Sequence, residues 1–156
     1  REMFDAVMEA ATEADLYVGA AAVADYAPKN ASAMKAKKND ASMEKLELEK
    51  TPDIIASLAA RRGESGDHSP VLVGFAAETD NVVEHARAKL VDKGLDLIVA
   101  NDVTQPDAGF AADTNVVTLV PKDGEHTTLP KMPKREVADR VLDEALALLK
   151  ETRPAR

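Results

Sequence analysis

Residues 19–38 read Gly-Ala-Ala-Ala-Val-Ala-Asp-Tyr-Ala-Pro-Lys-Asn-Ala-Ser-Ala-Met-Lys-Ala-Lys-Lys, a strand end followed by a basic arm. The first residues are too small to fill a core, so they leave the backbone open to a ligand. One acid, Asp25, and one aromatic residue, Tyr26, follow. The arm then carries Lys29, Lys35, Lys37 and Lys38 with no acid among them. Lysines supply mobile positive charges, so this stretch predicts a site for a polyanionic ligand.

The composition of the chain limits what that ligand is. The 156 residues carry a formal net charge of -8 and only 3% aromatic side chains. An acidic protein repels nucleic acid and anionic membrane surfaces, and the usual aromatic platforms for stacked bases are scarce. We therefore expect no nucleic-acid partner and no membrane partner, and a locally cationic patch where an anion binds.

The absence of cysteine and of targeting segments narrows the class further. No cysteine is present, which excludes a catalytic thiol, a disulfide framework and thiolate metal sites. No apolar run approaches the roughly 20 residues of a membrane span, and no signal peptide is visible. These features predict a cytoplasmic protein.

The hydrophobic pattern predicts an α/β fold. Apolar residues at helical spacing occupy residues 2–14, and short apolar runs typical of buried parallel strands occur at 16–22, 71–77 and 95–100. Helical patterns separate these runs, since one follows the run at 16–22 and another follows the run at 71–77. We expect a Rossmann-like, mostly parallel sheet with flanking helices, forming a single domain over residues 1–156.

Three further segments complete the predicted fold. Residues 27–50 read as a β-flap with one basic limb, and residues 115–129 as a C-terminal hairpin followed by a helix that Pro133 opens. Thr51 and Pro52 have the residue types of an N-cap and a first helical position. Thr79 is the expected cap of the helix that precedes Gly94.

Ligands of open parallel sheets bind at the carboxyl ends of the strands. That rule brings together Ala21–Asp25, Phe75–Glu78 and Asn101–Asp102. Each candidate has a plainer alternative. The alanines are also typical of tight packing between a helix and the sheet. Asp25 is also typical of a turn, and Phe75 is also typical of the hydrophobic core. Glu78, Asn101 and Asp102 suit either a substrate amide or carboxylate or the capping of turns.

The lysines have alternatives of their own. Lys35, Lys37 and Lys38 suit a triphosphate or a solvated loop. Lys89 and Lys93 share one helix face, where like charges repel unless an anion bridges them. The alternative for this pair is an exposed face with ion pairs to Asp92 or Glu84. The sequence has no Walker A motif, no Gly-x-Gly-x-x-Gly and no Gly-x-Ser-x-Gly, so dinucleotide oxidoreductases and serine hydrolases lack support.

Five motifs in order give the chain a family resemblance. They are Ala-Ala-Val-Ala-Asp-Tyr (21–26), Lys-Ala-Lys-Lys (35–38), Thr-Pro-Asp-Ile (51–54), Gly-Phe-Ala-Ala-Glu-Thr (74–79) and Ala-Asn-Asp-Val (100–103). The chain resembles bacterial phosphopantothenate–cysteine ligase, also called phosphopantothenoylcysteine synthetase. In most bacteria that ligase is the C-terminal domain of a bifunctional coenzyme A biosynthesis protein, after a flavin-dependent decarboxylase domain.

The resemblance implies a reaction, its partners and its site residues. CTP activates the carboxylate of 4′-phosphopantothenate as an acyl-cytidylate, pyrophosphate leaves, and L-cysteine attacks to give the amide and CMP. It implies Mg²⁺ with the triphosphate, near Asp25, a homodimer, and FMN only on the decarboxylase domain. Lys35 is implied to be required for activity. The implied CTP contacts are Gly19, Ala20, Ala21, Asp25, Lys35, Pro52, Asp53, Ile54, Ile55, Phe75, Lys89 and Lys93.

One part of the family pattern has no match in this sequence. The family's sheet starts with an earlier strand, a Gly-Gly-Thr turn and a loop whose asparagine acts on the acyl-cytidylate. We therefore expect the chain to be the C-terminal portion of a larger ligase domain and to be inactive alone. The alternative from another class is a non-catalytic nucleotide-binding or dimerisation module.

Overall fold

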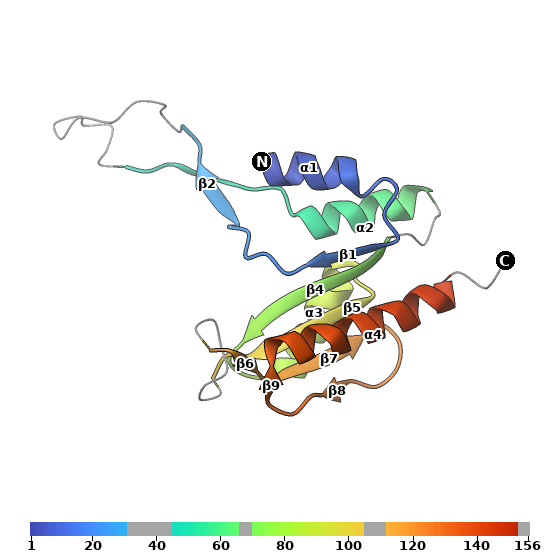
Figure 1. The fold of residues 1–156 in the computed structure, drawn as a ribbon. Coiled ribbons are helices and arrows are strands. Elements are labelled where there is room, and N and C mark those ends of the chain that lie inside the picture. Colours follow the sequence, from blue (N-terminus) through green and yellow to red (C-terminus); the bar gives the residue numbers. More distant parts are fainter. Residues whose placement is uncertain (31–44, 66–69, 105–111, 153–156) are drawn as a thin grey trace.

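The computed structural model describes residues 1–30, 45–65, 70–104 and 112–152, and its centre is a five-stranded sheet (Figure 1). The strands of this sheet are, in spatial order, β1 (Leu16–Gly19), β4 (Val71–Glu78), β5 (Leu97–Asp102), β7 (Val117–Pro121) and β8 (Thr127–Thr128). β1, β4 and β5 are parallel, whereas β7 and β8 add antiparallel pairs. The predicted mostly parallel α/β sheet is confirmed, although β1 ends at Gly19 rather than at residue 22.

Helices cover both faces of the sheet. The helices α1 (Glu2–Ala10), α2 (Ile54–Ser65) and α3 (Val82–Lys93) pack on one face, and α4 (Lys134–Thr152) packs on the other (Figure 1). Leu72 and Ile98 point to the first face, and Val73 and Val99 point to the α4 face, because side chains alternate along a strand. No helix in the described ranges is long and apolar enough to cross a membrane.

Two short antiparallel pairs lie outside the main sheet. β2 (Tyr26–Pro28) pairs with β3 (Leu48–Lys50), with Tyr26 opposite Lys50, and these strands are the two limbs of the predicted flap. The hairpin base extends away from the central sheet (Figure 1). β6 (Thr114–Asn115) pairs with β9 (Met132–Pro133), directly before α4. Lys35, Lys37 and Lys38 lie outside the described residues.

Both predicted N-caps are wrong by two residues. α2 begins at Ile54, and the carboxylate of Asp53 accepts a hydrogen bond from the Ala56 N–H at 3.1 Å. Asp53 is therefore the capping residue, whereas Thr51 donates its hydroxyl to the Ala24 carbonyl at 2.6 Å. α3 follows Asn81, which adopts a left-handed conformation (φ 42°) that asparagine tolerates, so Thr79 is not its cap.

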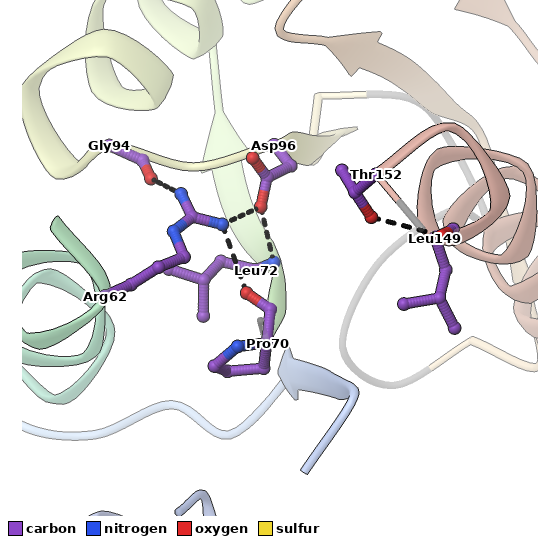
Figure 2. Close-up of polar contacts among 7 residues, drawn as sticks. All are labelled: Arg62, Pro70, Leu72, Gly94, Asp96, Leu149 and Thr152. Atoms are coloured by element: carbon purple, nitrogen blue, oxygen red, sulfur yellow. Dashed lines mark hydrogen bonds and ion pairs between the residues drawn. The ribbon is translucent and has the colours of Figure 1, made fainter. Parts of the chain in front are cut away.

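An arginine–aspartate network joins the helices to the end of the sheet opposite the strand carboxyl ends (Figure 2). Asp96 accepts hydrogen bonds from the Arg62 guanidinium and, at 2.8 Å, from the Leu72 N–H. Arg62 also donates to the carbonyls of Pro70 at 3.1 Å and Gly94 at 2.9 Å. Gly94 ends α3 with φ 66°, a conformation that favours glycine. The network therefore fixes α2, α3, β4 and β5 against one another.

Candidate functional site

The carboxyl ends of three parallel strands meet at one edge of the sheet. Gly19 of β1 lies opposite Gly74 of β4, and Ala77 of β4 lies opposite Asn101 of β5. This register places the three segments that the strand-end rule selected at the same edge, as predicted. The segment that follows β1, residues 20–25, is exposed. The exposure argues against the alternative that its alanines serve tight helix packing.

The larger cavity at this edge lies on the face covered by α1, α2 and α3, and we call it the helix-side cavity. Its volume is about 280 Å³. Its walls come from β1 and the segment after it, from the start of α2, from β4 and from one face of α3. The lining residues that sequence analysis selected are Gly19, Ala21, Asp25, Pro52, Asp53, Ile54, Ile55, Phe75, Lys89 and Lys93.

Most of the residues predicted to bind nucleotide thus lie around one cavity, although they come from four separate parts of the sequence. Two predicted residues are not in this lining. Ala20 lines a second cavity on the α4 face, and Lys35 falls outside the described residues. Tyr17, Gly74 and Ile98 also line the helix-side cavity, although they were not predicted as site residues. Their strand pattern marked them only as core residues.

The start of α2 is tied to the segment that follows β1. The Thr51 N–H donates to the Asp25 carbonyl at 2.9 Å, and the Thr51 hydroxyl donates to the Ala24 carbonyl. These bonds hold the flap base against the cavity rim. They also explain why Pro52 and Asp53 face the same space as Ala21 although about thirty positions separate them in sequence.

Lys89 and Lys93 project from α3 to the helix-side cavity, and each already has a carboxylate partner. Lys89 Nζ lies 2.7 Å from Glu78 Oε1, and Lys93 Nζ lies 2.9 Å from Asp53 Oδ2. The alternative pairing with Asp92 or Glu84 is therefore wrong, because the partners come from β4 and from the start of α2. A polyanion that binds these lysines competes with two built-in carboxylates.

The Asp53 carboxylate has a pKa below the ordinary aspartate value of 3.8. Partial burial acts to raise this pKa, but the hydrogen bonds from Lys93 and Ala56 and the charge of Lys93 outweigh it. Nearby Tyr17 shows the opposite effect, since burial and the charge of Asp53 raise the pKa of its phenol. At neutral pH the cavity therefore holds an ionised carboxylate beside a neutral phenol.

The Asp53–Lys93 pair predicts a pH dependence. Because folding lowers the Asp53 pKa, the stabilisation is complete above pH 3.8 and is lost as pH falls through the folded-state value. We expect Asp53→Asn, which keeps a capping side chain, to lower stability by about 0.5 kcal/mol at pH 6, since the pair is half-exposed. Urea titrations of both proteins from pH 6 to pH 3 measure this. A difference that grows toward low pH contradicts the assignment.

Asp25 lies exposed at the cavity rim, and its backbone carbonyl is held by Thr51. Across the described ranges, no three or more histidine, aspartate or glutamate side chains come together as a metal cluster. Mg²⁺ commonly binds through one or two carboxylates together with substrate phosphates. Asp25 suits that arrangement, in which most metal ligands come from the substrate and from water.

A second cavity of about 260 Å³ lies at the same edge on the other face, and we call it the α4-side cavity. The two cavities share the lining residues Gly19, Ala21, Ala22 and Phe75. Phe75 is 41% exposed, so core packing does not account for it. The lining residues of the α4-side cavity are Gly19, Ala20, Ala21, Ala22, Phe75, Ala76, Ala77, Asn101, Asn115 and Lys134.

Two side-chain oxygens beside the α4-side cavity lack a donor. Oδ1 of Asn101 and Oδ1 of Asn115 are buried and accept no hydrogen bond from any residue that the structure describes. Such an atom costs about 1–3 kcal/mol relative to a satisfied one. Asn101 was predicted as a site residue from its place at a strand end, whereas Asn115 and Lys134 were not predicted. Only the packing of β6 and α4 brings these two to the edge.

Known proteins resemble this chain over nearly its whole length. Residues 1–149 match the family model described as DNA/pantothenate metabolism flavoprotein C-terminal domain. The coenzyme A biosynthesis bifunctional protein CoaBC of Bacillus subtilis (strain 168) is 46% identical over 151 residues, which are 97% of this chain and 36% of that protein. The protein of the same name in Escherichia coli (strain K12) is 43% identical over 145 residues, 92% of this chain and 34% of that protein.

Two solved structures share the fold. A crystal structure of the C-terminal domain of a coenzyme A biosynthesis bifunctional protein CoaBC has a TM-score of 0.73 and 35% identity, covering 96% of this chain and 62% of that one. The DNA/pantothenate metabolism flavoprotein from Streptococcus pneumoniae has a TM-score of 0.65 and 27% identity, covering 94% and 66%. The chain spans about a third of the length of the curated relatives that it matches.

Proposed function

Because the chain belongs to the DNA/pantothenate metabolism flavoprotein C-terminal domain family, we propose that it is the nucleotide-binding part of a ligase in coenzyme A biosynthesis. The ligase joins 4′-phosphopantothenate to L-cysteine and consumes CTP. The observation that carries this proposal is the helix-side cavity, where residues from four parts of the sequence surround an open backbone floor and two lysines. The similarity to CoaBC proteins supports the pathway.

The cavity suits a nucleoside triphosphate in each of its parts. The exposed backbone after β1 offers N–H and C=O groups to a base and a ribose. The start of α2 presents the positive end of a helix dipole, and Lys89 and Lys93 supply charges for the phosphates. Ile54 and Ile55 give the cavity an apolar wall. In this proposal Lys35 adds a further charge from the flap.

Magnesium accompanies the triphosphate in this proposal. Asp25 is the residue that would contribute a carboxylate to it, because it lies exposed at the rim and forms no ion pair with any residue that the structure describes. When bound, the ion neutralises part of the triphosphate charge. FMN belongs to a separate decarboxylase domain in the proposed whole protein.

The reaction follows from the chemistry of a carboxylate, which is a poor electrophile. An oxygen of the 4′-phosphopantothenate carboxylate attacks the α-phosphorus of CTP, and the bond to pyrophosphate breaks. The cysteine amine, after losing one proton, attacks the acyl carbon of the resulting acyl-cytidylate. The new C–N bond forms as the C–O bond breaks, CMP leaves with that electron pair, and the nitrogen loses a second proton. The site's task is to position the anions and neutralise them.

The complete gene product that contains this sequence provides the test. With CTP, 4′-phosphopantothenate and L-cysteine together, we expect stoichiometric pyrophosphate, CMP and phosphopantothenoylcysteine. Omission of any one substrate should abolish the final product. CTP binding without any pyrophosphate release would instead favour a non-catalytic nucleotide-binding module.

Assembly and location are further parts of the proposal. We propose a homodimer in which the flap that begins at β2 and returns at β3 approaches the neighbouring subunit's site. Light scattering coupled to size exclusion, on the complete gene product, distinguishes a dimer from a monomer. A cytoplasmic location follows from the proposed pathway, and fractionation of the source cells tests it.

A further inference from the structure

We propose that the α4-side cavity binds the amine substrate of the ligation as a zwitterionic α-amino acid. Asn101 and Asn115 hold its ammonium group, and Lys134 attracts its carboxylate. The inference rests on the proposed function, because it assigns the second substrate of that reaction to a place in the fold. It adds Asn115 and Lys134, which no sequence motif and no predicted nucleotide contact includes, and it gives Asn101 a specific substrate group to bind.

The position of the cavity suits an attacking nucleophile. Asn101 has the same strand parity as Val99, so it lies on the α4 face, opposite the helix-side cavity. The two cavities have four lining residues in common, Gly19, Ala21, Ala22 and Phe75, which form a shared wall. An acyl group activated at this wall would therefore have the nucleotide on one side and the amine on the other.

The polar groups of the cavity match an amino acid at both ends. An amide oxygen accepts hydrogen bonds, and an ammonium group offers three donors. The two buried oxygens accept none from the described part of the chain, and an asparagine carboxamide turns readily about its last torsion. A ligand with N–H donors gives each oxygen a partner once the amide turns toward the cavity.

The opposite end of the amino acid meets positive charge. Lys134 is the charged residue of the described lining and is also the first residue of α4, a helix of 19 residues. A carboxylate near this point benefits from the ammonium group and from the helix dipole. The volume of about 260 Å³ lies just below the range typical of drug-sized ligands. The alanines that form much of the wall leave room for a short side chain.

The test separates the two half-reactions on the complete gene product. Without amine, CTP and 4′-phosphopantothenate should give a burst of pyrophosphate. A series of L-cysteine concentrations then reports the second step. We expect Asn101→Leu and Asn115→Leu each to raise the half-saturating cysteine concentration about 10- to 100-fold, the loss expected for one hydrogen bond to a charged group. Asn101→Asp, which keeps an acceptor, should retain more of the cysteine binding.

A comparison of two amines tests the carboxylate end. Cysteamine has the ammonium group of cysteine without its carboxylate. Lys134→Met should therefore raise the half-saturating concentration of cysteine but not that of cysteamine, whereas Asn101→Leu should raise both. Lys150→Met, at the far end of α4, is the charge-matched control and should change neither. Thermal unfolding of each variant checks that it is folded.

The outcomes distinguish the inference from the function on which it rests. Absence of the pyrophosphate burst in the unsubstituted protein overturns the proposed function. A normal burst with unchanged cysteine dependence in all three variants overturns the inference alone. A lost burst in folded Asn101→Leu or Asn115→Leu also overturns it, because the cavity then serves the acid substrate.

Discussion

Replacement of both Lys89 and Lys93 by methionine is expected to weaken CTP binding by about 100-fold or more. Each lysine lies at the helix-side cavity on the same face of α3. A hydrogen bond to a charged group contributes about 1.5–3 kcal/mol, so the loss of two contacts amounts to a factor of at least about 100. Titration calorimetry with CTP, with Mg²⁺ present, measures the change directly.

The carboxylate partners of the lysines require their own controls. Glu78 is only 7% exposed, so Lys89→Met alone leaves a buried carboxylate without its lysine partner, with His85 Nδ1 3.7 Å away, a change that destabilises the protein whatever its ligand. Lys89→Met combined with Glu78→Gln removes both charges and should weaken CTP binding while keeping the fold. Glu78→Gln alone frees Lys89 from a competing anion and should retain or strengthen binding.

A second control separates a local contact from the field of the whole protein. Lys150→Met makes the change of charge of either single α3 substitution, but at the opposite edge of the sheet, and should leave CTP affinity within about twofold of the original. Equal weakening by Lys150→Met and by Lys93→Met alone would contradict a direct contact. Salt should weaken CTP binding to the unsubstituted protein more than to the double variant, because fewer ionic contacts remain in the variant.

The sequence predicted which segments meet at the carboxyl edge of the sheet, because parallel strands place their carboxyl ends side by side. Unalternating apolar runs around Val18, Val73 and Val99 indicate strands buried between helices, and such strands end at a common edge. The exact ends could not be predicted in the same way. The alanines after Gly19 continue the apolar run, yet they leave the sheet because no neighbouring strand pairs with them in the described residues.

The ion pairs of the site show what a sequence pattern omits. Helical spacing offers Glu84 and Asp92 as partners for the α3 lysines, since residues three or four apart are neighbours on a helix. The observed partners, Glu78 and Asp53, are brought there by the packing of α3 on β4 and α2. The same limit explains why Asn115 was missed, because no local signal marks a residue that long-range packing alone carries to a strand edge.

Asp96→Ala is expected to lower the free energy of unfolding by about 3 kcal/mol, the largest stability change that we predict. Asp96 accepts hydrogen bonds from Arg62 and from the Leu72 N–H, and the side chains of Asp96 and Arg62 are 16% and 14% exposed (Figure 2). Removal of one partner of a buried pair typically costs about 3–5 kcal/mol, and the residual exposure favours the lower end. For a chain of this size the melting temperature should fall by roughly 6–12 °C.

An exposed aspartate provides the control for Asp96→Ala. Asp123→Ala removes an exposed acid at the turn after β7 and should change stability by less than about 0.5 kcal/mol. Asp96→Asn keeps an acceptor for the Leu72 N–H, and its stability should fall between those of Asp96→Ala and Asp123→Ala.

Arg62 anchors the C-terminal end of α2, whereas Asp53 to Ile55 line the helix-side cavity at the other end. Folded Asp96→Ala should therefore bind CTP with nearly unchanged affinity. If its melting temperature falls no further than that of Asp123→Ala, the network does not hold the helices to the sheet as we infer.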